Sequence, residues 1–164
     1  MNIREVIDGD FDGIWPIFHN IVFMGETYAY PRDTSKVQAQ KIWIEAPRKT
    51  YVVEEEGIIV GTYFIKTNQA GAGSHVCNCG YMVSATARGR GIASFMCKHS
   101  QKQARDLGYK AMQFNFVAET NEAAIRLWHK LTFETVGRLP KAFNHPSLGF
   151  VDALVIYKWL DGNL

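Results

Sequence analysis

The residues of this chain with the clearest chemical use are the glycines and arginines of the segment 88–94, which reads Arg-Gly-Arg-Gly-Ile-Ala-Ser. We expect this segment to end a strand and to begin a long helix, where backbone N–H groups are unpaired and the helix dipole is positive. Gly89 and Gly91 allow a ligand to approach the backbone closely, and Arg88 and Arg90 add positive charge. The turn therefore predicts a site for an anion such as pyrophosphate.

Other phosphate-binding patterns agree less well with this segment. The Gly-Lys-Ser/Thr of a P-loop is absent from it. The spacing of Gly89, Gly91 and Ser94 partly imitates the dinucleotide-binding fingerprint, but that fingerprint should follow the first strand of a βαβ unit. A tight strand-to-helix turn with solvent-facing arginines explains the pattern equally well, so its interpretation depends on the surrounding elements.

Those elements alternate imperfectly between strands and helices. Apolar residues at spacings of three and four, with capping residues before them, predict helices over residues 10–22, 35–44, 91–107 and 121–131. Alternating or β-branched stretches predict strands over residues 3–6, 51–55, 58–66, 76–83, 111–117, 134–138 and 150–159. Residues 139–149 are expected to form a long loop of the kind that is often functional. This order predicts an α/β (α+β) fold with a mixed sheet covered by helices.

Composition excludes several classes of protein. The 164 residues suit one domain over 1–164, and 47% hydrophobic residues are enough for a packed core. A net charge of +2 is too small to predict a nucleic-acid partner. The chain begins without the apolar core of a signal peptide and has no run long enough to span a membrane, so we expect a cytoplasmic location and no membrane partner.

The three cysteines are not arranged as a metal or redox motif. Cys77 and Cys79 are two residues apart, which is not a zinc-binding spacing, and no metal site is expected. They should share one face of a strand as small buried side chains, as should Cys97 on its helix. A reactive thiol would instead require a lowered pKa.

Two motifs, considered together, relate the predicted anion-binding turn to a known family. The turn has the form Arg-x-x-Gly-x-Ala, and the helix after the next strand has the form Asn-x-x-Ala-x-x-Leu, with a phenylalanine just beyond it. This combination resembles the GNAT acetyltransferase superfamily, whose signature is Gln/Arg-x-x-Gly-x-Gly/Ala followed by Asn-x-x-Ala-x-x-Leu-Tyr-x-Lys-x-Gly-Phe. The resemblance covers the whole order of elements and is sharpest from Tyr81 to Phe133. It implies a mostly antiparallel, splayed sheet, an acetyl-CoA cosubstrate, transfer of acetyl to an amine and a possible homodimer.

The resemblance also implies a set of cofactor-binding residues. Backbone groups of Tyr81, Met82 and Val83 should pair with the pantetheine arm of the cofactor. Asn121 should hydrogen-bond near its sulfur end, or act as a plain helix N-cap, or do both. The pyrophosphate should be held at the turn by Arg88 and by the amides of Gly89, Arg90, Gly91, Ile92, Ala93 and Ser94.

Three further residues are candidates for the chemistry itself. Asn78 and Asn115 are unusual because asparagine is disfavoured in strands and a buried amide needs partners. The resemblance implies that their two strands separate to admit the thioester, so these amides could polarise the acetyl carbonyl or orient the acceptor. The alternative is that they satisfy loop backbone. Glu26, in an aromatic connection with Tyr28 and Tyr30, is a candidate base or simply an exposed acid.

The acceptor is predicted less narrowly than the cofactor. Asn78, Asn115 and Asn121, with the stretches 137–141 and 151–154, resemble fungal acetyltransferases that act on proline analogues such as azetidine-2-carboxylate. This resemblance implies a small-molecule amine, such as an amino acid or a proline analogue, attacked directly and without a covalent enzyme intermediate. A protein or peptide amine is the first alternative, and a non-catalytic acyl-CoA-binding module is the second.

One departure from the family motif bears on the mechanism. Trp128 stands where the family usually has the tyrosine that protonates the departing thiolate. An indole N–H donates a hydrogen bond but has no acid role near neutral pH. Because a thiol has a pKa of about 8.5, its thiolate is a fair leaving group without that acid. The usual proton donor is therefore not predicted here.

Overall fold

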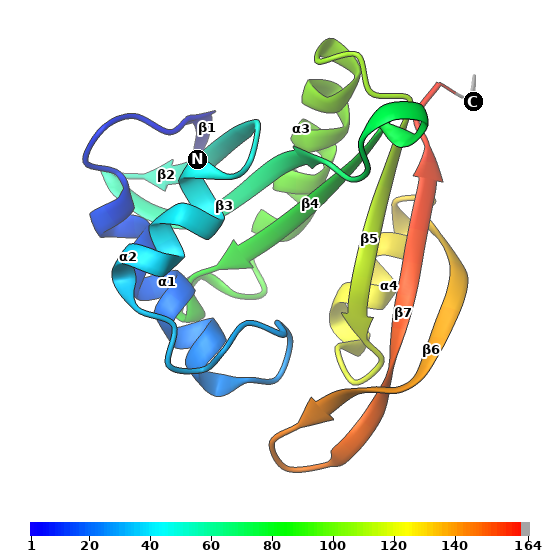
Figure 1. Ribbon diagram of the computed structural model, residues 1–164. Helices are drawn as coiled ribbons and strands as arrows, with labels where there is room; N and C mark the ends of the chain where they lie inside the picture. The colour runs from blue at the N-terminus through cyan, green and yellow to red at the C-terminus, as the bar shows by residue number, and fades with distance from the viewer. Residues whose placement is uncertain (162–164) are drawn as a thin grey trace.

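The computed structural model describes residues 1–161 and contains one sheet of seven strands in the order β1-β2-β3-β4-β5-β7-β6. All neighbouring strands are antiparallel except β4 and β5, which are parallel. Figure 1 shows the resulting mixed sheet, which confirms the predicted fold class. The strands are β1 (Asn2–Glu5), β2 (Lys49–Glu55), β3 (Ile58–Thr67), β4 (Val76–Val83), β5 (Ala111–Ala118), β6 (Glu134–His145) and β7 (Gly149–Trp159).

The sheet opens between its two parallel strands. Only Val76–Asn78 of β4 pairs with β5, opposite residues 111–113. Beyond these residues the two strands move apart, and Figure 1 shows the widening gap between them. On the far side of β5, the register with β7 shifts between Phe114 and Val117, so this strand also bends where the gap begins.

Helices cover both faces of the sheet. α1 (Phe11–Met24) and α2 (Lys36–Gln40) share one buried cluster with β3 and β4, centred on Phe18, Trp43 and Phe64. α3 (Ile92–Asp106) and α4 (Glu122–Lys130) pack in the other cluster, which contains Met96 and Trp128. In Figure 1 the first pair of helices lies in front of the sheet and the second pair behind it. Successive residues of β3 and β4 therefore point into different cores, as Phe64 and Met82 in one cluster and Tyr63 and Cys79 in the other show.

The second predicted helix is shorter and less regular than expected. It begins at Ser35 with a capping box, in which the Ser35 side chain accepts from the Gln38 N–H and the Gln38 side chain accepts from the Ser35 N–H. After α2 the chain forms a π-helical turn over Lys41–Glu45. This turn places the fully buried Trp43 so that its Nε1 donates to Thr62 Oγ1 of β3 over 3.0 Å. Packing of one large side chain explains the local irregularity.

The prediction of a long loop over residues 139–149 is wrong. β6 continues to His145 and pairs with β7 as a long hairpin. Sequence signals for a strand are weak there, since Pro140 has no N–H to donate. β6 lies at the edge of the sheet, where proline is tolerated. A register shift between Leu139 and Phe143, with Lys141 at φ 54°, accommodates the interruption. The hairpin carries His145 toward the opening of the sheet.

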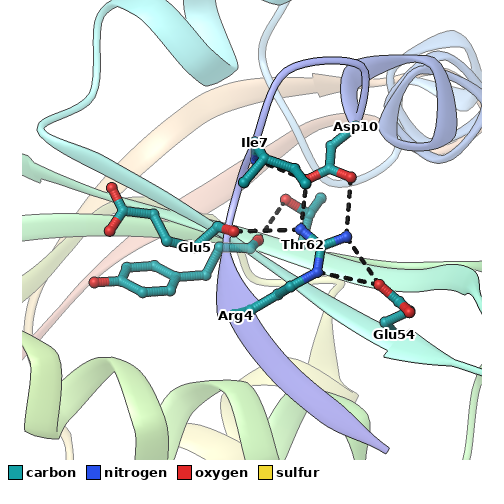
Figure 2. A network of polar contacts seen from close by, with 7 residues as sticks. Arg4, Glu5, Ile7, Asp10, Glu54 and Thr62 are labelled. Atoms are coloured by element: carbon teal, nitrogen blue, oxygen red, sulfur yellow. Dashed lines mark hydrogen bonds and ion pairs between the residues drawn. The ribbon is translucent and has the colours of Figure 1, made fainter.

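Arg4 fixes the start of α1 to the edge of the sheet (Figure 2). Its guanidinium contacts Asp10 Oδ2 at 2.6 Å and Glu54 Oε2 at 2.8 Å, and Asp10 Oδ2 also accepts from the Ile7 N–H. The hydrogen bonds from Arg4 lower the pKa of Asp10 below its ordinary value, while partial burial opposes this shift. The pKa of the Arg4 guanidinium is raised by the same contacts. No helix within residues 1–161 is long and apolar enough to cross a membrane.

The contact between Asp10 and Arg4 should stabilise the fold in a pH-dependent way. Asp10→Asn is expected to lower the free energy of unfolding by about 1 kcal/mol at pH 7, because it removes a charge-assisted pair. A native pKa below the unfolded value of about 3.9 stabilises the fold above that pH. This contribution is lost as the pH falls through the lowered native pKa. Thermal unfolding of both proteins between pH 3 and pH 7 measures the difference.

Asp12→Asn is the matched control, since its exposed carboxylate pairs with Lys36 on the surface. Its effect should stay below about 0.5 kcal/mol. Equal losses in the two variants, or an Asp10→Asn loss that does not change with pH, would contradict the assignment.

Candidate functional site

A pocket of about 890 Å³ lies where β4 and β5 separate. Its wall includes the predicted residues Glu26, Asn78, Asn115 and Asn121. It also includes Tyr81, Met82, Val83, Arg88, Gly89, Gly91, Ile92, Ala93 and Ser94. The sequence-predicted residues from five separate segments are thus brought to one cavity. The exception is Arg90, whose guanidinium pairs with Glu55 Oε2 at 2.7 Å on the β2–β3 side of the turn.

The exposed edge of β4 supplies backbone groups to this pocket. Ser84 N–H donates to the Val60 carbonyl of β3, so alternate residues of β4, including Met82, direct their backbone groups toward β3. The residues between them, Tyr81 and Val83, face the gap where β5 has moved away. The Tyr81 carbonyl accepts from the Tyr28 hydroxyl at 2.9 Å. The backbone groups of Tyr81 and Val83, rather than those of Met82, therefore face the gap and are placed to pair with a ligand.

The turn after β4 has the geometry of an anion site at a helix start. Gly89 and Gly91 have φ of 76° and 77°, the left-handed region in which other residues are strained. α3 begins at Ile92, and the first hydrogen bond of the helix runs from Phe95 N–H to the Gly91 carbonyl. The amides of Ile92, Ala93 and Ser94 therefore precede that bond and have no partner within the helix. The glycines are needed for the backbone path as well as for close approach of a ligand.

The two strand asparagines lie near each other but in different environments. Asn78 is 9% exposed, and its Nδ2 donates to the Gln113 carbonyl at 2.9 Å. This bond uses one of the two N–H groups of Nδ2, so the Asn78 side chain keeps its Oδ1 as an acceptor and a second N–H as a donor. Asn115 is exposed rather than buried, and its Nδ2 donates to Asn68 Oδ1 at 2.7 Å. Each amide nitrogen thus makes one hydrogen bond within the protein and keeps a second N–H.

The connection between α1 and α2 covers the pocket with aromatic rings. Tyr28 and Tyr30 stack with their centroids 5.6 Å apart, and Glu26 lies beside them as an exposed carboxylate. Burial raises the pKa of Tyr30 to about 12 and that of Tyr28 further. Both hydroxyls therefore remain neutral at physiological pH. Glu26 is the acid group that this connection contributes to the wall.

His145 reaches the pocket from the hairpin and is 9% exposed. Its Nδ1 accepts from the backbone N–H groups of Ser147 and Leu148 at 3.2 and 3.3 Å. In the neutral ring the proton must then be on Nε2. In this tautomer, Nε2 is the ring atom that can donate a hydrogen bond to a ligand.

Trp128 forms part of an aromatic wall between α4 and the separated strands. Its ring lies 5.1 Å from that of Tyr81 and 4.9 Å from that of Phe114. The Tyr81 hydroxyl lies 2.7 Å from Ser100 Oγ, and burial raises the pKa of Tyr81 well above its ordinary value. The wall is thus apolar and supplies no acid. Asn121 is the N-cap residue of α4, as one of the two interpretations expected, but its side chain makes no capping hydrogen bond.

Several pocket residues were not predicted from the sequence, and two of them, Cys79 and Thr120, carry polar atoms that are buried. Cys79 lines the cavity, and burial raises the pKa of its thiol well above the ordinary value. Thr120 also lines it, and its buried Oγ1 has no hydrogen-bond partner among the described residues. The only sequence signal for either was position, since Cys79 lies two residues before Tyr81 and Thr120 directly precedes Asn121.

The pattern of the acetyltransferase (GNAT) family matches residues 15–133. N-acetyltransferase aca1 of Schizosaccharomyces pombe is 36% identical over 98 residues, which cover 59% of this chain and 47% of that protein. The chain therefore matches about half the length of this curated relative.

Solved structures agree over nearly the whole chain. A GCN5-related N-acetyltransferase of Kribbella flavida has a TM-score of 0.91 and 38% identity, with 96% of each chain covered. The structure of yncA of Salmonella typhimurium with its cofactor acetyl-CoA has a TM-score of 0.84 at 20% identity, covering all of this chain and 96% of that one. The motif match, the splayed sheet and these relatives agree: this chain belongs to the GNAT acetyltransferase family.

Proposed function

We propose that this chain transfers acetyl from acetyl-CoA to the amine of a small molecule by direct attack. The observation that carries the proposal is one pocket whose wall holds both the anion-binding turn and the polar residues Glu26 and Asn78. Asn78 is near the start of β4 and Val83 at its end, about 16 Å apart for an extended chain. The cavity can therefore hold a phosphate group at one place and a reaction at another.

The cofactor would lie along β4. Its pyrophosphate would rest on the amides of Ile92, Ala93 and Ser94, with the guanidinium of Arg88 beside it. Its pantetheine amides would pair with the backbone of Tyr81 and Val83, which β5 leaves open. Acetyl-CoA is the cofactor of the structurally similar yncA, which supports this choice of ligand.

The reaction requires a neutral amine. Attack of its nitrogen on the thioester carbonyl carbon forms a C–N bond, and the C–S bond then breaks to release the thiolate of CoA. The proton lost by the amine passes to Glu26, directly or through water, in this scheme. Asn78 Oδ1 would accept a hydrogen bond from the amine and orient its lone pair toward the carbonyl carbon. The second N–H of Asn78 Nδ2 would still be able to donate to the acetyl oxygen, as expected from the sequence.

The leaving thiolate needs no acid from the wall. Trp128 has no acidic proton, and the Tyr81 hydroxyl bonds with Ser100 on α3. A thiol pKa of about 8.5 makes the thiolate a fair leaving group, and water can protonate it later. Cys79 remains a neutral thiol because burial raises its pKa, which favours direct transfer over an acetyl-cysteine intermediate.

Arg88 should contribute to cofactor binding through its charge. Arg88→Ala is expected to raise the KM for acetyl-CoA about tenfold with little change in kcat, since a charge-assisted contact with phosphate is lost. Arg90→Ala is the matched variant and should raise this KM less, because that guanidinium pairs with Glu55 outside the pocket wall. Initial rates at varied acetyl-CoA measure both. A larger effect at Arg90 than at Arg88 would reverse the assignment.

Asn78 should act on the chemical step. Asn78→Ala is expected to lower kcat about 10- to 100-fold while leaving the KM for acetyl-CoA unchanged, because the acceptor nitrogen loses its orienting partner. Asn115→Ala should have a smaller effect, since this exposed amide bonds with Asn68. Thiol release with a panel of small amines provides the assay.

Two results would argue against these assignments. Wild-type kcat in Asn78→Ala would remove Asn78 from the reaction. Tight binding of CoA without turnover of any amine would favour a non-catalytic acyl-CoA-binding module.

A further inference from the structure

Polar residues from three strands gather on one face of the sheet beside the pocket. Lys66 of β3 lies directly across from Asn78 of β4, which in turn pairs with Gln113 of β5. Residues paired across strands point to the same face, and here it is the face on which Phe64 packs against α1 and α2. The Gln113 side chain donates to Asn115, and Asn115 donates to Asn68 just after β3. We call these five residues, 66, 68, 78, 113 and 115, the polar strand cluster.

Lys66 is the only charged member of the polar strand cluster. It is half-buried, and its Nζ lies 5.4 Å from the centroid of the Phe64 ring, which lines the pocket. Asn78, its cross-strand neighbour, lines the pocket as well. None of the ion pairs formed among residues 1–161 includes Lys66. Lys66 itself is not part of the pocket wall, but its ammonium lies over a ring that is, and it has no carboxylate partner among residues 1–161.

The position of Lys66 matters because the pocket wall contains few charged side chains. The wall contains two side chains of fixed charge, Glu26 and Arg88. Arg88 belongs to the turn at the end of β4, about a strand length from Asn78. Glu26, from the α1–α2 connection, lines the same pocket as Asn78, and Lys66 of β3 is the cross-strand neighbour of Asn78. One acidic and one basic group thus belong to the surroundings of the pocket that contains the proposed reaction.

We infer that Lys66 binds a carboxylate of the acceptor, which is therefore an amino acid or imino acid. This inference rests on the function proposed above. The acceptor nitrogen would lie at Asn78 Oδ1, and the carboxylate attached to the neighbouring carbon would pair with Lys66 Nζ. Cross-strand side chains begin about 5 Å apart, a span that an α-amino acid bridges. The flexible stem of lysine lets its ammonium follow a small substrate.

The same pairing explains how the site tolerates a substrate with a negative charge. A free carboxylate near Glu26 would be repelled, whereas one paired with Lys66 is neutralised locally. An amide in place of the carboxylate would leave the ammonium without its anion. The site should then discriminate between an acid and its matched amide mainly through binding.

Steady-state kinetics with matched acceptors tests the inference. The probes are azetidine-2-carboxylate, proline and alanine, each compared with its carboxamide, at saturating acetyl-CoA. Wild type should prefer at least one acid over its amide. Lys66→Met should lower kcat/KM for the acid about 10- to 100-fold, mostly through KM, and leave that of the amide nearly unchanged. Lys66→Arg should restore most of the preference. Lys102→Met is the control, because this exposed lysine pairs with Asp106 on α3.

The outcomes separate this inference from the proposed function. Acetylation of amides as readily as acids by wild type, or an unchanged preference in Lys66→Met, would overturn the role of Lys66 and leave the acetyltransferase proposal standing. No acetylation of any acid or amide would overturn both. Equal losses for acid and amide in Lys66→Met, with an unchanged Tm, would likewise contradict carboxylate binding.

Discussion

The separation of β4 from β5 is the constraint on which the rest of the structure depends. Two parallel strands that pair over three residues and then diverge leave backbone N–H and C=O groups without partners. Such groups are costly when they are buried, so a fold keeps them only if something else satisfies them. Tyr28 satisfies one of them by donating to the Tyr81 carbonyl. The others face a cavity, and a cofactor arm with amides of its own is a suitable partner.

The aromatic wall holds this opening at a fixed width. Tyr81, Phe114, Trp128 and Phe133 contact one another between α4 and the two separated strands. A tryptophan fills more of this space than a tyrosine, and buried aromatic pairs are stabilising beyond the area they bury. At the position where the family usually has a tyrosine that can donate a proton, Trp128 therefore contributes packing instead. The substitution suits a reaction whose leaving group departs without help.

Sequence patterns predicted the elements well but the polar geometry poorly. Periodicity and capping residues indicated the order of helices and strands, because each element buries one face. The hairpin over residues 139–149 was missed, since a proline at an edge strand and a bulge together imitate a loop. The glycine-rich turn before α3 could be predicted because its backbone path depends on glycines and a helix start, which are local in sequence. The hydrogen bonds of Asn78 with Gln113 and of Asn115 with Asn68 could not be predicted, because these partners are distant in sequence.

The distribution of charge within the pocket follows from the same geometry. Burial keeps Cys79, Tyr28 and Tyr81 neutral, because a charged form of any of them would lie in an apolar wall. Fixed charge is therefore confined to places where the wall meets water, at Glu26 and at Arg88. A thioester carbonyl between these places lies in a medium of low polarity, where a nearby charge or dipole acts more strongly than in water. In the proposed scheme, the charge of the cofactor would be bound at Arg88, about a strand length from Asn78, where the acetyl group would be transferred.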